Sequence, residues 1–163
     1  MSAWPSEAWR VKRSLGRCIG FSLLSFGAYA PYWVYVTRKL LDLELRNGRD
    51  DAAFHTVGTF VPVLNFFVTY WIWRDIDRLR QSIGLRRFEP GLLVGLTVIG
   101  GAPITYSVVL GYLNEYWDWR SQGHASDAPF TTGEKLVVLG GALLWVLFAV
   151  GIALAIVLAA TSS

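Results

Sequence analysis

The sequence predicts an all-α integral membrane protein, a bundle of four transmembrane helices with amphipathic extensions at the membrane surface. Three observations predict this fold class. Hydrophobic residues make up 53% of the 163 residues and charged residues only 17%, against roughly 45–50% and about 25% in soluble domains. The apolar residues gather in four blocks that carry no charge near their centres. Three of these blocks end in a Tyr-Trp pair that is closely followed by arginine.

The chain divides into a basic lead and a transmembrane domain. Residues 1–17 hold four basic side chains and two tryptophans, and we expect them to lie at the membrane interface. Residues 18–163 are expected to form the transmembrane domain. Its spans are predicted at residues 18–36, 53–73, 91–113 and 136–160. The last block has 25 residues without a charge, and as a helix of roughly 37 Å it would cross a hydrocarbon layer of about 30 Å.

The stretches after the first two blocks are expected to continue as amphipathic helices. After the second block, Ile72, Ile76, Leu79 and Ile83 recur at intervals of four, three and four residues. Such spacing places them on one face of a helix, opposite the arginines of the same stretch. We therefore expect the helices to extend beyond the membrane into the surface layer.

The aromatic and basic residues at the block ends are predicted to anchor the protein at the membrane interface. Tyr and Trp favour the boundary between lipid and water, and arginine reaches from there to phosphate or water. The predicted anchors are Tyr32, Trp33, Tyr35, Arg38, Tyr70, Trp71, Trp73, Arg74, Tyr116, Trp117, Trp119 and Arg120.

Small residues at intervals of four predict close helix packing. They occur as Gly91 and Gly95 in the third block and as Gly151, Ala155 and Ala159 in the fourth. Small side chains let helix backbones approach closely in lipid. Packing within the protein and packing against a partner subunit both fit this pattern.

The charge distribution favours an arrangement with both termini in the cytoplasm. With four spans and the N-terminus inside, nine basic residues lie inside and six outside, in the direction of the positive-inside rule. A rival arrangement arises because each of the first three blocks contains helix breakers, and any of these blocks could be a re-entrant hairpin. The breakers are Gly27 with Pro31, Gly58 with Pro62, and Gly100 and Gly101 with Pro103.

The sequence offers no catalytic, cofactor or metal constellation. Asn65, Thr97, Tyr106 and Ser107 are the main polar groups at depth, and we expect interhelical hydrogen bonds from them; a substrate contact at Asn65 is the alternative. His55 and His124 are weak candidates for cofactor ligands. Nucleic-acid binding is not expected, because the fifteen basic residues lie at block edges instead of in one run. Cys18 is expected to be a buried small apolar residue.

The end of the first block resembles a known motif. Residues 27–33 read Gly-Ala-Tyr-Ala-Pro-Tyr-Trp, and Gly27, Tyr29, Tyr32 and Trp33 match Gly-x-Tyr-x-x-Tyr-Trp. This motif marks a prokaryotic family of small multi-pass membrane proteins of unknown function. The similarity extends over residues 10–120, with the fourth block as an addition. The resemblance implies a bacterial or archaeal plasma (inner) membrane protein and no particular activity.

Three functions are compatible with these features. The leading hypothesis is a non-catalytic accessory, scaffold or stabilising subunit of a larger membrane complex, whose partners are the lipid bilayer and other membrane-protein subunits. The alternative is a small transporter or lipid-binding membrane protein, because broken helices often build sites at mid-membrane. An enzyme that acts at the headgroup layer through Glu115, Asp118 or His124 is the least favoured hypothesis.

Overall fold

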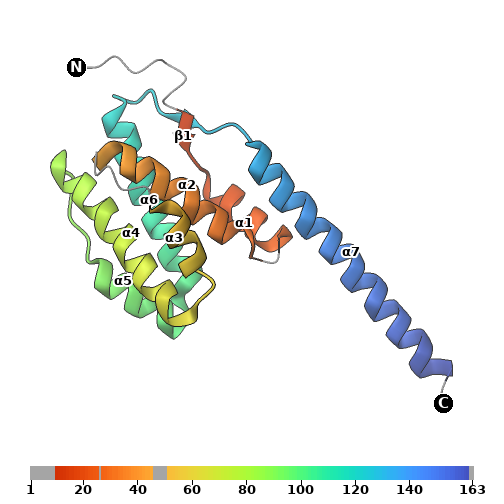
Figure 1. The fold of residues 1–163 in the computed structure, drawn as a ribbon. Helices are drawn as coiled ribbons and strands as arrows, with labels where there is room; N and C mark the ends of the chain where they lie inside the picture. Colours follow the sequence, from red (N-terminus) through yellow and green to blue (C-terminus); the bar gives the residue numbers. More distant parts are fainter. Residues whose placement is uncertain (1–9, 26, 46–50, 162–163) are drawn as a thin grey trace.

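The computed structural model describes residues 10–25, 27–45 and 51–161 and consists almost entirely of helices (Figure 1). The all-α prediction is confirmed. The predicted basic lead is described only from residue 10 onward, where it forms a short strand. The elements are β1 (Arg10–Lys12), α1 (Leu15–Leu24), α2 (Tyr29–Leu45), α3 (Ala52–Gly58), α4 (Pro62–Ser82), α5 (Pro90–Leu96), η2 (Thr97–Gly101), α6 (Ala102–Arg120), β2 (Ser126–Asp127) and α7 (Thr132–Thr161).

The first apolar block folds as two helices, α1 and α2, so the predicted single helix at residues 18–36 is wrong. Gly27 lies between them with a φ of 83°, a left-handed conformation that glycine adopts without steric cost. Its N–H donates to the carbonyl oxygen of Ser22 at 2.7 Å, which closes the turn as at many helix ends. Pro31 lies in the first turn of α2, where its missing N–H has no intrahelical partner to lose.

The second and third blocks also reverse direction, which corrects the predicted single helices at residues 53–73 and 91–113. In the second block, α3 and α4 are joined by residues 59–61, and Pro62 opens α4, a position that proline favours. In the third block the chain turns through η2. The hydroxyl oxygens of Thr97 and Thr105 lie 2.9 Å apart, although eight residues of a straight helix would separate them by about 12 Å. Each of the first three blocks is therefore a helical hairpin.

The fourth block forms one long helix, α7, which begins at Thr132 instead of residue 136 and ends at Thr161. Among the described residues it is the one helix long and apolar enough to cross a membrane, so the predicted bundle of four spanning helices is not confirmed. Its N-terminal half packs on the α1–α2 hairpin. A Cβ atom at Gly141 would lie 2.2 Å from the Cα of Ser25, so only glycine permits this crossing. The C-terminal half projects from the rest of the molecule (Figure 1).

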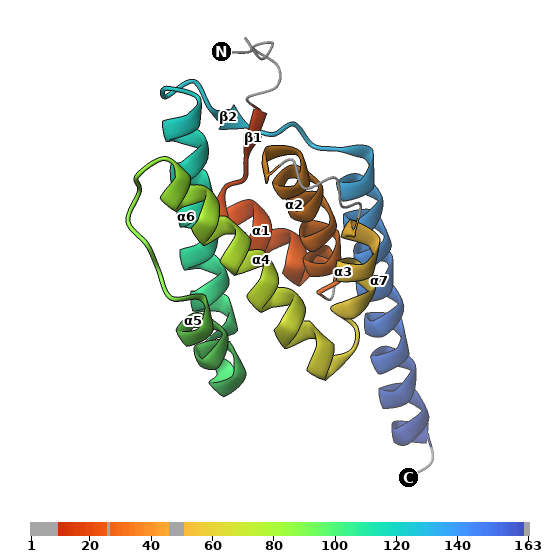
Figure 2. The same cartoon turned by 60° about the vertical axis from the view of Figure 1, so that its left-hand side comes forward.

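The three hairpins and α7 share one polar end. α2, α4 and α6 all end there, α7 begins there, and the parallel pair β1–β2 lies over it (Figure 2). Ion pairs join the helix ends directly: Arg80 of α4 contacts Glu115 of α6 at 2.6 Å, and Arg120 of α6 contacts Glu44 of α2 at 3.7 Å. The hairpin turns of α3–α4 and α5–α6 point to the opposite end (Figure 2).

The core lies between α2, α4 and α6 and is rich in aromatic side chains. The rings of Trp33 and Trp73 both meet the ring of Tyr106 edge-on, with centroids 5.9 and 5.4 Å apart. Such edge-on pairs stabilise beyond their area of burial by about 0.5–1.5 kcal/mol each. The core therefore holds the polar halves of the three hairpins together.

Candidate functional site

The buried charged residues of the described chain gather toward the polar end of the bundle. In the sequence, no Lys, Arg, Asp or Glu lies within residues 18–37, 52–73, 90–114 or 136–163. Because each of the first three blocks turns back on itself, the charged stretches on either side of it meet at one end (Figure 2). Several of these charges are buried there in three clusters.

The first cluster surrounds Arg38, whose side chain is almost fully buried. It donates to Asp75 of α4 at 2.5 Å and to Asp51, just before α3, at 2.6 Å. It also contacts Asp42, one turn further along α2, at 2.9 Å. One guanidinium thus ties together α2, the start of α3 and the middle of α4. A planar group with five donors suits this role better than an ammonium.

Asp42 differs from the other two carboxylates that contact Arg38 because it lacks a hydrogen bond. Both of its carboxylate oxygens are buried without a hydrogen bond, so its contact with Arg38 is ionic instead of a well-aligned hydrogen bond. Burial raises the pKa of Asp42 above its usual range; the charge of Arg38 opposes this rise and that of Asp51 adds to it. Asp42 therefore depends on Arg38 for its ionised form.

The second cluster surrounds Glu134 in the first turn of α7, whose side chain is fully buried. Its carboxylate accepts from Arg17 at 2.5 Å and from the hydroxyl of Tyr29 at 2.9 Å, and lies 3.6 Å from Arg13. It also accepts from the N–H of Thr131 at 3.0 Å, while the Thr131 hydroxyl accepts from the N–H of Glu134 at 3.1 Å. This reciprocal pair is a capping box. Through Arg17 and Tyr29, the Glu134 cluster joins the start of α7 to α1 and α2.

The third cluster joins α4 to α6. Arg80 donates to Glu115 at 2.6 Å and to the carbonyl oxygen of Tyr112 at 2.9 Å. Nearby, Tyr116 donates to Glu44 at 3.1 Å. Burial and the neighbouring carboxylate of Glu44 raise the pKa of Tyr116 above its usual range. The predicted amphipathic extensions of the first two blocks are thus helical, but they pack on one another through buried charges.

The structure divides the predicted interface anchors into two groups. Trp33, Trp73, Tyr116 and Trp117 are each no more than 6% exposed, as is Arg38, so they contact protein and not lipid headgroups. This corrects the prediction for these five residues. The remaining anchors are exposed or half-buried: Tyr32, Tyr35, Tyr70, Trp71, Arg74, Trp119 and Arg120. For these seven residues, interface anchoring stays a prediction.

The predicted packing glycines do not pack within the protein. A Cβ atom at Gly91, Gly95 or Gly151 would meet no atom within 4 Å, and Ala155 is exposed, as is Ala159. This corrects the intramolecular alternative, and packing against a partner subunit stays a prediction. The close approaches lie elsewhere, at Gly58, Gly133 and Gly141.

The two histidines bond to neighbouring backbone. The Nδ1 atom of His55 lies 2.9 Å from the carbonyl oxygen of Asp51, and that of His124 lies 2.9 Å from the carbonyl oxygen of Ser121. Within the described part of the chain, no group of three or more His, Cys, Asp or Glu side chains is placed to hold a metal ion. His55 lies in the Arg38 cluster, 3.3 Å from the carboxylate of Asp51.

Two of the polar residues predicted at depth make hydrogen bonds between helices. The hydroxyl of Thr69 on α4 lies 3.2 Å from that of Tyr106 on α6 and 3.4 Å from the side-chain oxygen of Asn65. Thr97 bonds across its own hairpin. Interhelical bonding is thereby confirmed for Tyr106 and Thr97, whereas Asn65 bonds within α4.

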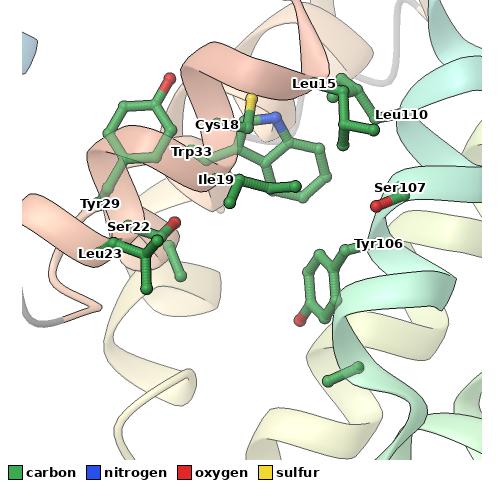
Figure 3. Close-up of a pocket in the computed structure, with 12 residues that line it drawn as sticks. Leu15, Cys18, Ile19, Ser22, Leu23, Tyr29, Trp33, Tyr106, Ser107 and Leu110 are labelled. Carbon is green, nitrogen blue, oxygen red and sulfur yellow. The ribbon is translucent and has the colours of Figure 1, made fainter.

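An apolar cavity of about 360 Å³ lies between α1, α2 and α6 (Figure 3). Figure 3 shows Cys18 and Ile19 of α1 close to the ring of Trp33, with Tyr106 and Ser107 on α6. Cys18 is half-buried there, not fully buried as predicted. The volume falls in the usual range for small-molecule sites, roughly 300–1,000 Å³. An apolar lining without a charged group suits a hydrocarbon occupant.

Large apolar side chains cover the surface away from the polar end. Among the most exposed are Leu23 of α1, Phe60 and Val63 at the α3–α4 turn, and Ile99 and Ile104 near the α5–α6 turn, at 67–79% exposure. Every described residue of α7 beyond Gly141 is also exposed. Soluble monomers rarely expose contiguous apolar patches beyond a few hundred Å². This surface therefore calls for lipid or protein to cover it.

No family model, curated protein or solved structure matches the chain.

Proposed function

We propose that this chain is a non-catalytic accessory subunit of a membrane complex, inserted through three re-entrant hairpins and one spanning helix. The hairpins enter the bilayer from the side of the polar end and return to it. α7 crosses and offers its distal half to a partner. The single observation that carries this proposal is the distribution of the surface, which is charged at one end and apolar over the rest.

The α3–α4 hairpin turn is suited to a lipid environment because its backbone donors are paired. The N–H groups of Thr59, Phe60 and Val61 each donate to the carbonyl oxygen three residues earlier, at 3.1–3.2 Å. The next residue, Pro62, has no N–H. Unpaired backbone groups cost several kcal/mol each in hydrocarbon, so this pairing supports burial of the turn in the bilayer.

Direct contacts also support the one-sided arrangement. β1 pairs with β2, and Lys12 contacts Asp118 at 2.9 Å, which joins the basic lead to the end of α6 and to the segment that follows it. Arg38 contacts Asp75 at 2.5 Å. In an arrangement with four spans, the two residues of each pair would lie on opposite sides of the membrane.

The positive-inside rule then orients the protein in a prokaryotic plasma (inner) membrane. With hairpins, all 15 basic residues lie on one side, which we assign to the cytoplasm. A single crossing by α7 places the C-terminus on the opposite face. This differs from the arrangement with both termini inside that follows from four spans.

A partner helix is expected on one face of α7. Gly151 and Ala155 lie one turn apart on that face, whereas Ala153 and Val157 lie on the opposite face. A photoreactive residue at position 155 is expected to cross-link to another membrane protein in native membranes. The same residue at position 153 or 157 is expected to give several-fold less adduct. Equal, absent or purely lipidic adducts, with a particle of monomer size in mild detergent, would contradict the accessory role.

A lipid-binding role is the second candidate, and the apolar cavity between α1, α2 and α6 favours it. The cavity reaches Tyr106, but the hydroxyl of this residue is engaged with Thr69 at 3.2 Å. A hydrocarbon tail suits this lining better than the hydrated solute of a transporter would.

A further inference from the structure

A polar pocket of about 260 Å³ opens beside Arg38, where α2, α3 and α4 meet. Three arginines, two aspartates, one histidine and two aromatic rings line it. It is separate from the apolar cavity, with which it shares no lining residue. Its combination of both charges with aromatic rings points to a ligand that has both charges and an apolar part.

Two of the arginines have hydrogen-bonding capacity to spare. Arg78, whose side chain is 59% exposed, lies 3.3 Å from Asp75, and Arg74, 39% exposed, lies 3.8 Å from the same carboxylate. Asp75 is already bonded to Arg38 at 2.5 Å. The Nε atom of Arg74 is buried with no hydrogen-bond partner in the described structure. Two guanidinium groups one helical turn apart suit a phosphate group.

The pocket also offers a carboxylate to a cation. Asp51 accepts from Arg38 at 2.6 Å, yet its side chain remains 30% exposed. An ionised carboxylate has about four acceptor sites, so this group can also accept from an ammonium. Asp42 contacts Arg38 but does not line the pocket. With Asp42 included, the arginines 38, 74 and 78 match the aspartates 42, 51 and 75 one for one. A ligand without net charge preserves this balance, whereas an anion or a cation would disturb it.

Apolar rings lead from the pocket onto the apolar surface. Phe54 of α3 lines the pocket and is 53% exposed. Trp71 lines it from α4, and the ring of Phe67, also 53% exposed, lies 6.1 Å from that of Trp71. A ligand with its polar part in the pocket would therefore lay an apolar part along these rings.

We propose that the pocket binds the zwitterionic headgroup of an aminophospholipid such as phosphatidylethanolamine. Arg74 and Arg78 hold the phosphate, Asp51 accepts from the ammonium, and the acyl chains follow Phe54 and Phe67. The proposal rests on the membrane placement proposed above. It assigns a preference for one class of lipid to a protein surface that would otherwise contact all bilayer lipids alike.

The test uses the full-length protein in mild detergent, titrated with dihexanoyl phosphatidylethanolamine by calorimetry. We expect this lipid to bind more tightly than dihexanoyl phosphatidylglycerol, whose headgroup is anionic. The double variant R74Q/R78Q is expected to weaken its binding by about tenfold or more, because charge-assisted hydrogen bonds are lost. The double variant R86Q/R87Q removes the same charge from exposed positions outside the pocket and is expected to change binding less than about twofold.

Three outcomes would overturn the proposal. They are equal binding of the two lipids, an equal loss in both double variants, and binding of inorganic phosphate as tight as that of the lipid. Glycerophosphoethanolamine, which has no acyl chains, is expected to bind more weakly but to need Arg74 and Arg78 equally. Its binding in detergent does not depend on the bilayer. Failure of the membrane placement would show separately, as release of the protein from membranes by an alkaline wash.

Discussion

Replacing Arg38 by methionine is expected to lower the free energy of unfolding by about 3–5 kcal/mol, because it leaves buried carboxylates without their cation. Asp42, Asp51 and Asp75 all lie within 2.9 Å of this guanidinium. Denaturant titration in mild detergent, followed by circular dichroism, measures the loss. Adding Asp42→Asn to Arg38→Met should recover part of it, because burial already disfavours the charge of Asp42.

The matched control for Arg38 is its neighbour Lys39. Its ammonium lies 5.8 Å from the centre of the Tyr35 ring, and its side chain is half-exposed. Lys39→Met removes the same charge and is expected to cost less than about 1 kcal/mol. Similar losses for the two variants would show that the carboxylates around Arg38 do not depend on it.

Replacing Glu134 by alanine is expected to have an effect of similar size, about 3–5 kcal/mol. The change leaves Arg13 and Arg17, each no more than 8% exposed, without a carboxylate. It also removes the capping box at the start of α7. Unfolding in detergent measures the loss of stability, and limited proteolysis after residue 125 should show that α7 detaches first.

Glu89 provides the control for Glu134. It too lies at the start of a helix, but its side chain makes no capping hydrogen bond and is 69% exposed. Glu89→Ala should therefore change stability by less than about 1 kcal/mol. If Glu134→Ala were equally mild, the buried cluster would not be what holds α7 to the hairpins.

The sequence predicted helices in the four apolar blocks but not the reversal of the chain within the first three. Apolar blocks are readable because helical segments without charges stand out in composition. Whether a block continues or turns back depends on its breakers. Gly27 turned out to occupy a left-handed turn, whereas Pro31 lies harmlessly in the first turn of a helix. The two residue types therefore do not carry equal weight as signs of a reversal.

The Tyr-Trp pairs show why interface anchors are hard to predict from sequence. The same rings that favour a membrane boundary also fill a protein core. Trp33 and Trp117 are buried because neighbouring hairpins cover them, and the spacing within one block carries no information about its neighbours. Tyr35 and Trp119, two residues further along, remain exposed.

The buried ion clusters were missed for a similar reason. Arg38, Asp51 and Asp75 belong to three separate helical regions, and only tertiary packing brings them together. Glu134 was different, because Thr131 three residues earlier completes the Thr-x-x-Glu signature of a capping box. That signature, read correctly, would have placed the start of α7 at Thr132.

The sidedness of the loops tests the hairpin arrangement most directly. On a Cys18→Ser background, single cysteines at the exposed positions Arg86, Ser126 and Thr161 can be labelled with a membrane-impermeant maleimide. Intact cells and inverted vesicles expose opposite faces of the membrane. We predict that positions 86 and 126 react only in inverted vesicles, and position 161 only in intact cells. Labelling of 86 and 161 from one face, with 126 from the other, would establish four spans and contradict the hairpins.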